Sequence, residues 1–430
     1  MATSENSSEL LERRVTAGLR GASWDSALLP SDMRTSVHPI RTADGAPVIG
    51  YLHCRGGEQT AVVIMHPREL LVSHYLVPYL LNAGYACWVQ GTRSVGNDIR
   101  LEHELAVHDV AAGMFELGRM GFQKIVLLGN SGGASLFAFY NQQALLDGPR
   151  RIERTPGGRP TKLADAALPI PHGFIFIAPH PGQGKLLLNA IDPSVSDESA
   201  PLSIDPALNP FGAENGFRIG SEGGADYDAD FVRRYREGQR ERVTRIDEFA
   251  HGLIEERMLE KKRLRAGEGG EVLKANYSGV FEVWRTDADL RCFDQKLDPS
   301  DRRWGSVWGA DPFVSNVGSV GFARICTPES WLSTWSAFSS NASFDRCGGA
   351  IEQPTLMVEY TGDNSVFPSD SDKIFLSIRS GNKQRHAIVG NHHGQSLRYD
   401  EPNGQEIAGA TVVNWLRERF ETAVPTQGAA

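Results

Sequence analysis

The turn at residues 129–133 constrains the fold of this chain more than any other segment. It reads Gly-Asn-Ser-Gly-Gly, follows an apolar run at residues 125–128, and precedes a helix-like stretch at residues 134–145. A short apolar run that ends in a turn is typical of a buried strand. Glycines around the serine tolerate backbone angles and close contacts that other residues do not. The pattern therefore predicts a strand, a sharp turn that presents Ser131 above a sheet, and a helix.

A serine in this setting is a candidate nucleophile. The G-x-S-x-G pattern is typical of a nucleophile elbow when it lies between a strand and a helix. The alternative is a glycine-rich turn without chemistry, because the bare pattern often arises by chance. The position between strand and helix favours Ser131 as the nucleophile.

Strand-like and helix-like segments alternate on both sides of this turn, which predicts an α/β fold with a mostly parallel central sheet and helices on both faces. Strands are expected at residues 35–41, 48–54, 61–65, 85–90, 125–128, 174–178, 355–360 and 386–389. Helices are expected at residues 73–82, 101–118, 134–145, 369–378 and 407–420.

The alternation stops between the sixth and seventh expected strands. Residues 183–353 contain proline-rich loops, a charged helix that starts at Ala229, and a stretch rich in Trp and Ser. The expected organisation is an N-terminal extension (1–34), an α/β core (35–182 and 354–422), a large, mainly helical cap or lid domain (183–353) and a flexible tail (423–430).

Composition narrows the class of protein. The chain has 430 residues, a net charge of −9 and 40% hydrophobic residues, which is typical of a globular protein and disfavours nucleic acid as a partner. No apolar run is long enough for a membrane span, and the polar N-terminus lacks the layout of a secretory signal. The five cysteines are scattered without a metal-like spacing. We therefore expect a cytoplasmic protein with free thiols, no membrane partner, no metal and no cofactor.

A nucleophilic serine needs a base, and the base needs an acid that orients it. On a sheet of this kind the three groups follow in the chain order Ser, acid, His. Asp363 follows the strand expected at residues 355–360 and is therefore the candidate acid. Its alternative role is that of a turn residue, since Gly-Asp-Asn is a good turn by itself.

Two adjacent histidines follow the last expected strand, where the base belongs. We favour His393 as the base, with His392 as the second choice, because His393 directly precedes Gly394. The sequence does not separate the two rigorously. An exposed histidine pair in a loop is the alternative.

An oxyanion hole needs two donors aimed at the developing charge. The N–H of Gly132, directly after the serine, is one candidate. The turn after the third strand supplies the other: Pro67 has no N–H, so Arg68 is favoured, with Glu69 second. His66 and His180, which lie at the ends of strands, are expected to line the substrate pocket.

With these residues in place, the chain resembles the α/β-hydrolase superfamily. The resemblance covers about residues 35–180 and 350–422. The His66-Pro67 turn resembles the His-Gly oxyanion turn of that family, with Pro in place of Gly. An insertion after strand six is where the family usually carries a cap. The resemblance implies hydrolysis of esters or related bonds through an acyl-enzyme.

The cap sequence bears on the substrate. It is rich in Trp and Phe, and because ligand pockets are mostly apolar and aromatic, we expect a bulky hydrophobic or aromatic small molecule as the substrate. The alternative for any single ring is the core of the cap itself. The charged helix at residues 229–264 is interpreted as a solvated face or a homodimer contact.

Three hypotheses about function remain open. The first is a serine hydrolase that cleaves a carboxylic ester or lactone. The second is a C–C bond hydrolase that acts on a ring-cleavage diketone through the same triad. The third is a ligand-binding homologue of this fold with slow turnover.

Overall fold

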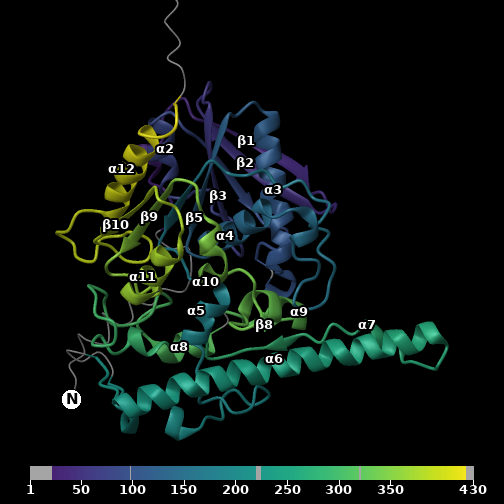
Figure 1. Ribbon diagram of the computed structural model, residues 1–430. Coiled ribbons are helices and arrows are strands. Elements are labelled where there is room, and N and C mark those ends of the chain that lie inside the picture. The colour runs from purple at the N-terminus through teal and green to yellow at the C-terminus, as the bar shows by residue number, and fades with distance from the viewer. Residues whose placement is uncertain (1–21, 97, 219–223, 319–320, 423–430) are drawn as a thin grey trace, which may run out of the picture.

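The computed structural model describes residues 22–96, 98–218, 224–318 and 321–422. In this part of the chain, eight strands form one sheet in the order β1-β2-β4-β3-β5-β6-β9-β10 (Figure 1). The strands are β1 (Arg34–Arg41), β2 (Pro47–Cys54), β3 (Thr60–His66), β4 (Ala86–Gly91), β5 (Lys124–Asn130), β6 (Gly173–Ile177), β9 (Thr355–Tyr360) and β10 (Lys383–Ile388). Strand β2 is antiparallel to β1 and β4, and every other neighbouring pair in the sheet is parallel.

Helices cover both faces of the sheet, as the alternation predicts. One face packs against α3 and α4, and the other packs against α2 and α12. The helices are α2 (Val77–Asn82), α3 (His103–Arg119), α4 (Gly132–Leu145), α5 (Gln183–Ala190), α6 (Ala229–Ala266), α7 (Val272–Asn276), α8 (Pro312–Val317), α9 (Pro328–Ser330), α10 (Phe344–Cys347), α11 (Pro368–Ser377) and α12 (Gly404–Arg417). The central strands β3 and β5 are almost wholly buried and rich in Val, Ile and Leu, which suits a parallel sheet covered on both faces. The predicted fold class is therefore confirmed.

Many element boundaries differ by a few residues from the sequence prediction, and the starts of α2 and β10 differ for clear physical reasons. Helix α2 begins at Val77, because the preceding segment, residues 73–76, is tied by backbone bonds to residues 22–24 and Leu71 rather than wound into a helix. Strand β10 begins at Lys383, three residues earlier than expected. Its first residues are polar and do not read as a strand, but they pair in register with β9 at the edge of the sheet.

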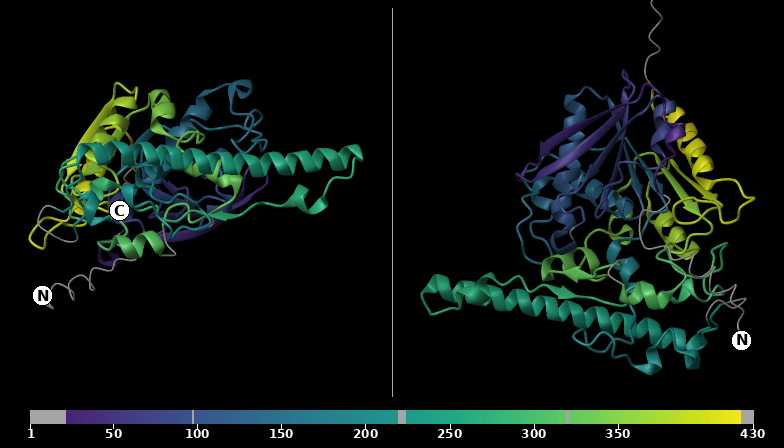
Figure 2. Two further views of the ribbon diagram at one scale, coloured as in Figure 1. Left: turned by 90° about the horizontal axis from the view of Figure 1, so that it is seen from below. Right: turned by 180° about the vertical axis from the view of Figure 1, so that it is seen from behind.

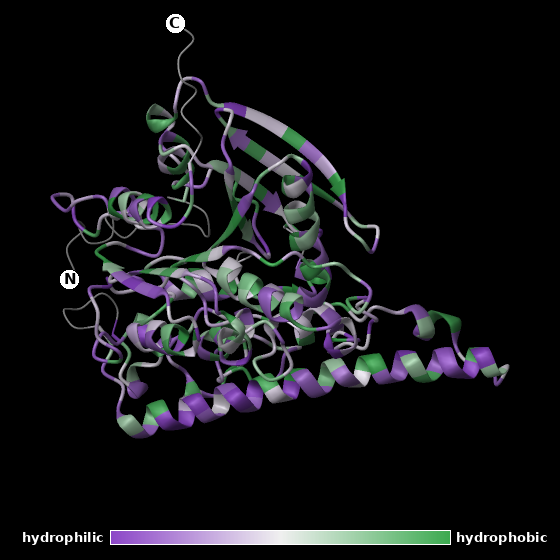
Figure 3. Cartoon of the chain, turned by 45° about the horizontal axis from the view of Figure 1, so that its top comes forward, coloured by the Kyte–Doolittle hydropathy of each residue, from purple (hydrophilic) through white to green (hydrophobic). Residues whose placement is uncertain are grey.

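Between β6 and β9 the chain leaves the sheet. Residues 183–353, called the insertion below, contain α5 to α10 and a two-stranded ribbon of β7 (Phe281–Glu282) and β8 (Ile325–Cys326). Helix α6 runs along the far side of the insertion from the sheet and extends beyond the body, with α7 beside its projecting end (Figures 1 and 2). Most of α6 is hydrophilic (Figure 3).

Helix α6 is anchored by an apolar stripe and by one buried cation. Val243, Ile246 and Ala250 pack into a cluster that contains Trp331 and Trp335. The Arg242 guanidinium is fully buried, donates to both carboxylate oxygens of Glu198, and also donates to backbone carbonyls. The helix is therefore fixed on one face while the other face meets solvent.

The two chain ends bear on two further predictions. Residues 1–21, the larger part of the expected extension, and the expected tail at 423–430 lie outside the described residues. Residues 22–24 bond to residues 73–75, and Trp24 packs against the core. Within the described part of the chain, no helix is long and apolar enough to cross a membrane, and all five cysteines are free.

Candidate active site

Ser131 lies at the sharp turn between β5 and α4. Its φ of 54° and ψ of −121° place it in a region that non-glycine residues rarely adopt, which is typical of a functional site that stores backbone strain. The turn needs its glycines because the backbone is crowded there. A Cβ on Gly133 would lie 2.1 Å from the Met65 carbonyl oxygen, and a Cβ on Gly129 would lie 2.5 Å from the backbone of Ala134. The local sequence therefore folds as the elbow that it predicts.

His392 connects the serine to Asp363. His392 Nε2 lies 3.2 Å from Ser131 Oγ, and His392 Nδ1 lies 2.7 Å from Asp363 Oδ2. The other carboxylate oxygen of Asp363 accepts bonds from the backbone N–H groups of Ser365 and Val366. An ionised carboxylate only accepts, so His392 Nδ1 carries the proton and Nε2 is left to accept from the serine. All three side chains are buried.

The structure corrects the first choice of histidine. His393 does not bond to Ser131 or Asp363. Its backbone N–H donates to Asn391 Oδ1 and its carbonyl accepts from Gln405. The turn at residues 390–394 directs the two adjacent rings differently, with an interplanar angle of 68°, and only His392 faces the serine. The second choice, His392, thus holds the place that the sequence assigned to His393.

His180, expected on the pocket wall, contacts the serine as well. Its Nε2 lies 2.9 Å from Ser131 Oγ and 3.2 Å from Ser365 Oγ, and its ring stacks on His392 at 5.4 Å. It lies two residues after Ala178, which, like Ser131, is a non-glycine residue with a positive φ. Burial holds the pKa of His180 well below its ordinary value, and the neighbouring His392 acts in the same direction.

The expected oxyanion donors have different surroundings. Gly132 opens α4, so its N–H has no partner within the helix. The Arg68 N–H instead donates to His66 Nδ1 at 3.2 Å, and the Glu69 N–H donates to the same atom at 3.1 Å. The expectation that Arg68 N–H is available for an oxyanion is therefore corrected: the His66 ring engages it.

The candidate residues come from four separate strand ends. Ser131 follows β5, His180 follows β6, Asp363 follows β9 and His392 follows β10. The carboxyl ends of parallel strands share one edge of a sheet, which is where α/β proteins place their ligands. A serine elbow after the central strand, with acid and histidine after later strands of this sheet, is decisive for the fold.

The chain has the α/β-hydrolase fold. Comparison with solved structures finds matches over most of the chain. They include DcsB in complex with its substrate analogue (TM-score 0.48, 13% identity, 90% of this chain and 99% of that chain). The esterase Pf2001 of Pyrococcus furiosus matches with a TM-score of 0.44 and 10% identity, over 90% of this chain and 92% of that chain. A monoacylglycerol lipase of Paleococcus ferrophilus matches with a TM-score of 0.39 and 13% identity, over 90% of this chain and 100% of that chain. At such low similarity these matches carry no conclusion about substrate. No protein-family model matches the sequence, and no curated protein matches it significantly.

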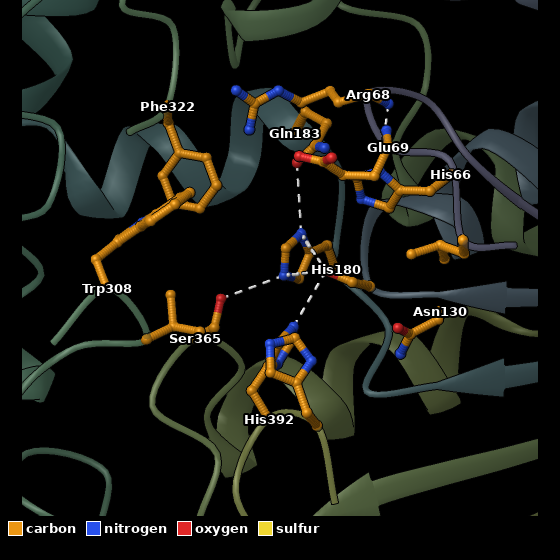
Figure 4. A pocket seen from close by; sticks show the side chains of 14 residues that line it. His66, Arg68, Glu69, Asn130, His180, Gln183, Trp308, Phe322, Ser365 and His392 are labelled. Carbon is orange, nitrogen blue, oxygen red and sulfur yellow. Dashed lines mark hydrogen bonds between the residues drawn. The ribbon is translucent and has the colours of Figure 1, made fainter. Parts of the chain in front are cut away.

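A pocket that opens to solvent lies beside the serine. Trp308 and Phe322 of the insertion stand on one side of it, and His66 and Asn130 of the α/β-hydrolase core stand on the other (Figure 4). His180 and His392 also line it. Trp331 and Trp335 lie in the core of the insertion instead. Some aromatic rings of the insertion therefore line the pocket, as expected for substrate contact, whereas others form the core of the insertion, as the alternative expects.

Several residues that line the pocket are not predicted from the sequence. Ser365 lies two residues after Asp363 in the same turn, and turn chemistry alone could have found it. Gln183, one turn after His180, faces the pocket, but no motif marks it. Trp308 and Phe322 reach the pocket only through the folding of the insertion. Among the described residues, no cluster of three or more His, Cys, Asp or Glu side chains could hold a metal ion.

Proposed function

We propose that this protein is a serine hydrolase that cleaves a carboxylic ester or lactone of a bulky hydrophobic small molecule. One observation carries the proposal: the chain of contacts from Ser131 through His392 to Asp363 at a strained elbow. Nucleophile, base and orienting acid lie within hydrogen-bond reach of one another, which is the arrangement that acyl transfer to a serine requires.

The reaction follows from the roles of these groups. Ser131 Oγ attacks the substrate carbonyl while His392 Nε2 takes its proton. Asp363 holds the imidazole in the Nδ1–H tautomer and stabilises the imidazolium that forms. The tetrahedral intermediate collapses as His392 returns the proton to the leaving alcohol, and the acyl group stays on Ser131. Water, activated by His392, then releases the carboxylic acid and restores the serine.

The pocket supports the substrate class. Its lining includes the apolar side chains of Leu71, Val307, Trp308 and Phe322, while the polar groups gather around Ser131. These apolar side chains favour a bulky hydrophobic acyl or alcohol group, and the polar side chains beside the serine are available to hold the carbonyl. His66 and His180, which the sequence predicts to line the substrate pocket, are both part of its lining, and His180 Nε2 lies 2.9 Å from Ser131 Oγ.

The test is hydrolysis of p-nitrophenyl esters from acetate to decanoate, plus benzoate. We expect turnover by the wild type, loss of turnover in Ser131→Ala, and a preference for the longer or aromatic acyl groups. Ser135→Ala is the matched control, because Ser135 lies one turn further along α4 and its hydroxyl bonds only to the Gly132 carbonyl. Absence of ester turnover in the wild type, with cleavage of a ring-cleavage diketone, would replace this proposal by a C–C bond hydrolase.

A further inference from the structure

The His66 ring is held by its own turn in an unusual way. It lies at the end of β3, almost wholly buried, and its Nδ1 faces two backbone amides. The Arg68 and Glu69 N–H groups both donate to this atom, at 3.2 and 3.1 Å. Since Pro67 has no N–H, these are the first two amides that the chain can offer after the strand.

These two bonds determine where the proton of the ring lies. Backbone N–H groups only donate, so Nδ1 must be the bare nitrogen, and a neutral ring then carries its proton on Nε2. Burial lowers the pKa of His66 to about 3, with the neighbouring Arg68 acting in the same direction. The ring is therefore neutral in ordinary buffers and presents a fixed Nε2–H.

This N–H lies beside the first expected oxyanion donor. A Cβ built on Gly132 would lie 2.9 Å from His66 Nε2, so the imidazole edge meets the residue that directly follows the nucleophile. His66 lines the same pocket as Ser131 (Figure 4). His66 Nε2 therefore lies close to Gly132, on the same side of the pocket as the residue that follows the nucleophile.

We propose that His66 is a catalytic residue whose Nε2–H, together with the Gly132 N–H, binds the oxyanion of the tetrahedral intermediate. The inference rests on the proposed serine hydrolase function and names the second donor of that reaction. The Arg68 and Glu69 amides then support the site indirectly, because they fix the tautomer and the orientation of the ring. His66 keeps its Nε2 proton throughout the reaction, so it neither gives a proton to the substrate nor takes one from it. A preorganised donor of this kind stabilises charge only as it develops.

Two substitutions separate the donor role of His66 from a role in holding the turn. His66→Asn keeps an acceptor near the Nδ1 position for the two amides but removes the donor at the Nε2 position. His66→Gln places an N–H near the Nε2 position but removes the acceptor. If the ring only anchors the turn, Asn is the better replacement, and if it binds the oxyanion, Gln is the better replacement.

The experiment measures kcat and KM for the best p-nitrophenyl ester with wild type and both variants. We expect His66→Asn to lower kcat by about 10²–10³-fold with little change in KM, as loss of one oxyanion donor does, and His66→Gln to retain most of the rate. Full activity in His66→Asn, or equal losses in both variants, would overturn the proposal.

Nitrogen-15 NMR of the histidine rings gives a readout that needs no substrate. We expect His66 to be neutral with a bare Nδ1 between about pH 5 and 8, and a protonated Nδ1 would reject the inference. Failure of the proposed function is recognised separately, because the wild type itself would then neither hydrolyse esters nor react with a fluorophosphonate at Ser131.

Discussion

At the scale of single residues, the site depends on which of two adjacent histidines faces Ser131. The ring of His392 bonds to Ser131 and to Asp363, whereas His393 bonds through its backbone to Asn391 and Gln405. Neighbouring positions in the chain thus have very different surroundings, and this gives a matched pair of substitutions.

We expect His392→Ala to lose ester hydrolysis by at least about 10³-fold, because the imidazole that Asp363 orients toward Ser131 is then gone. His393→Ala is the control, and we expect a far smaller loss, since the described hydrogen bonds of the Ser131 hydroxyl and the Asp363 carboxylate do not include His393. Steady-state kinetics of the two variants on one ester measure the difference. Equal losses would contradict the assignment of His392.

The elbow glycines give a second prediction at this scale. Gly133→Ala would place a methyl group 2.1 Å from the Met65 carbonyl oxygen, so backbone must shift. We expect a loss of about 1–3 kcal/mol in the free energy of unfolding together with reduced turnover. Gly118→Ala near the end of α3 is the control, because nothing lies within 4 Å of the added carbon, and there a gain of about 0.5–1 kcal/mol is expected. Urea unfolding of both variants checks the signs.

At the scale of elements, much of this site could be predicted from the sequence because strand ends carry it. Ser131 and Asp363 follow strands that read clearly, and a parallel sheet brings such ends together. The choice between His392 and His393 depends on the backbone path of residues 390–394, which no periodicity reveals. The hydrogen bond from the Arg68 N–H to His66 Nδ1 depends on the orientation of the His66 ring, which the sequence does not reveal. The positions of Trp308 and Phe322 in the pocket depend on long-range packing within the insertion.

A buried carboxyl couples the insertion to the core. Glu104 on α3 accepts bonds from Ser333 Oγ at 2.5 Å and from Asn341 Nδ2 at 2.9 Å, both in the insertion. Burial raises the pKa of Glu104 to about 7. The folded protein therefore keeps a proton on Glu104 that the unfolded chain has already released above about pH 4.5.

The protonated Glu104 carboxyl contributes about 3 kcal/mol to the free energy of unfolding. This contribution is fully present below about pH 4.5 and is lost as the pH rises through about 7. We expect Glu104→Gln to become more stable relative to the wild type over this range. Urea unfolding of both proteins at a series of pH values measures the difference. A difference that does not change with pH would contradict the raised pKa.

At the scale of the whole molecule, buried neutral histidines make the fold sensitive to acid. Burial is the main cause in each case, lowering the pKa of His66 and His74 to about 3 and that of His103 to about 4, and that of His180 well below its ordinary value. The unfolded chain binds these protons below about pH 6.5, whereas the folded protein does not. Stability that is present above about pH 6.5 is therefore lost as the pH falls toward about 4.

His66, His74 and His103 each contribute a loss of roughly 2 kcal/mol at about pH 5, and the sum outweighs the opposite effect of Glu104. We expect the urea midpoint to fall steeply between about pH 6.5 and 5. His103→Gln should make the fall shallower. A midpoint that stays constant down to about pH 5 would show that the buried rings are not held neutral.

The central claim is that the whole fold presents Ser131 as a nucleophile, and covalent trapping tests it most directly. The wild type, Ser131→Ala and His392→Ala would be incubated with a fluorophosphonate, and the modified residue would be located by peptide mass spectrometry. We expect one adduct on Ser131 in the wild type, none in Ser131→Ala, and a much slower reaction in His392→Ala. An unmodified wild type, or the same adduct mass on Ser131→Ala, would contradict the claim.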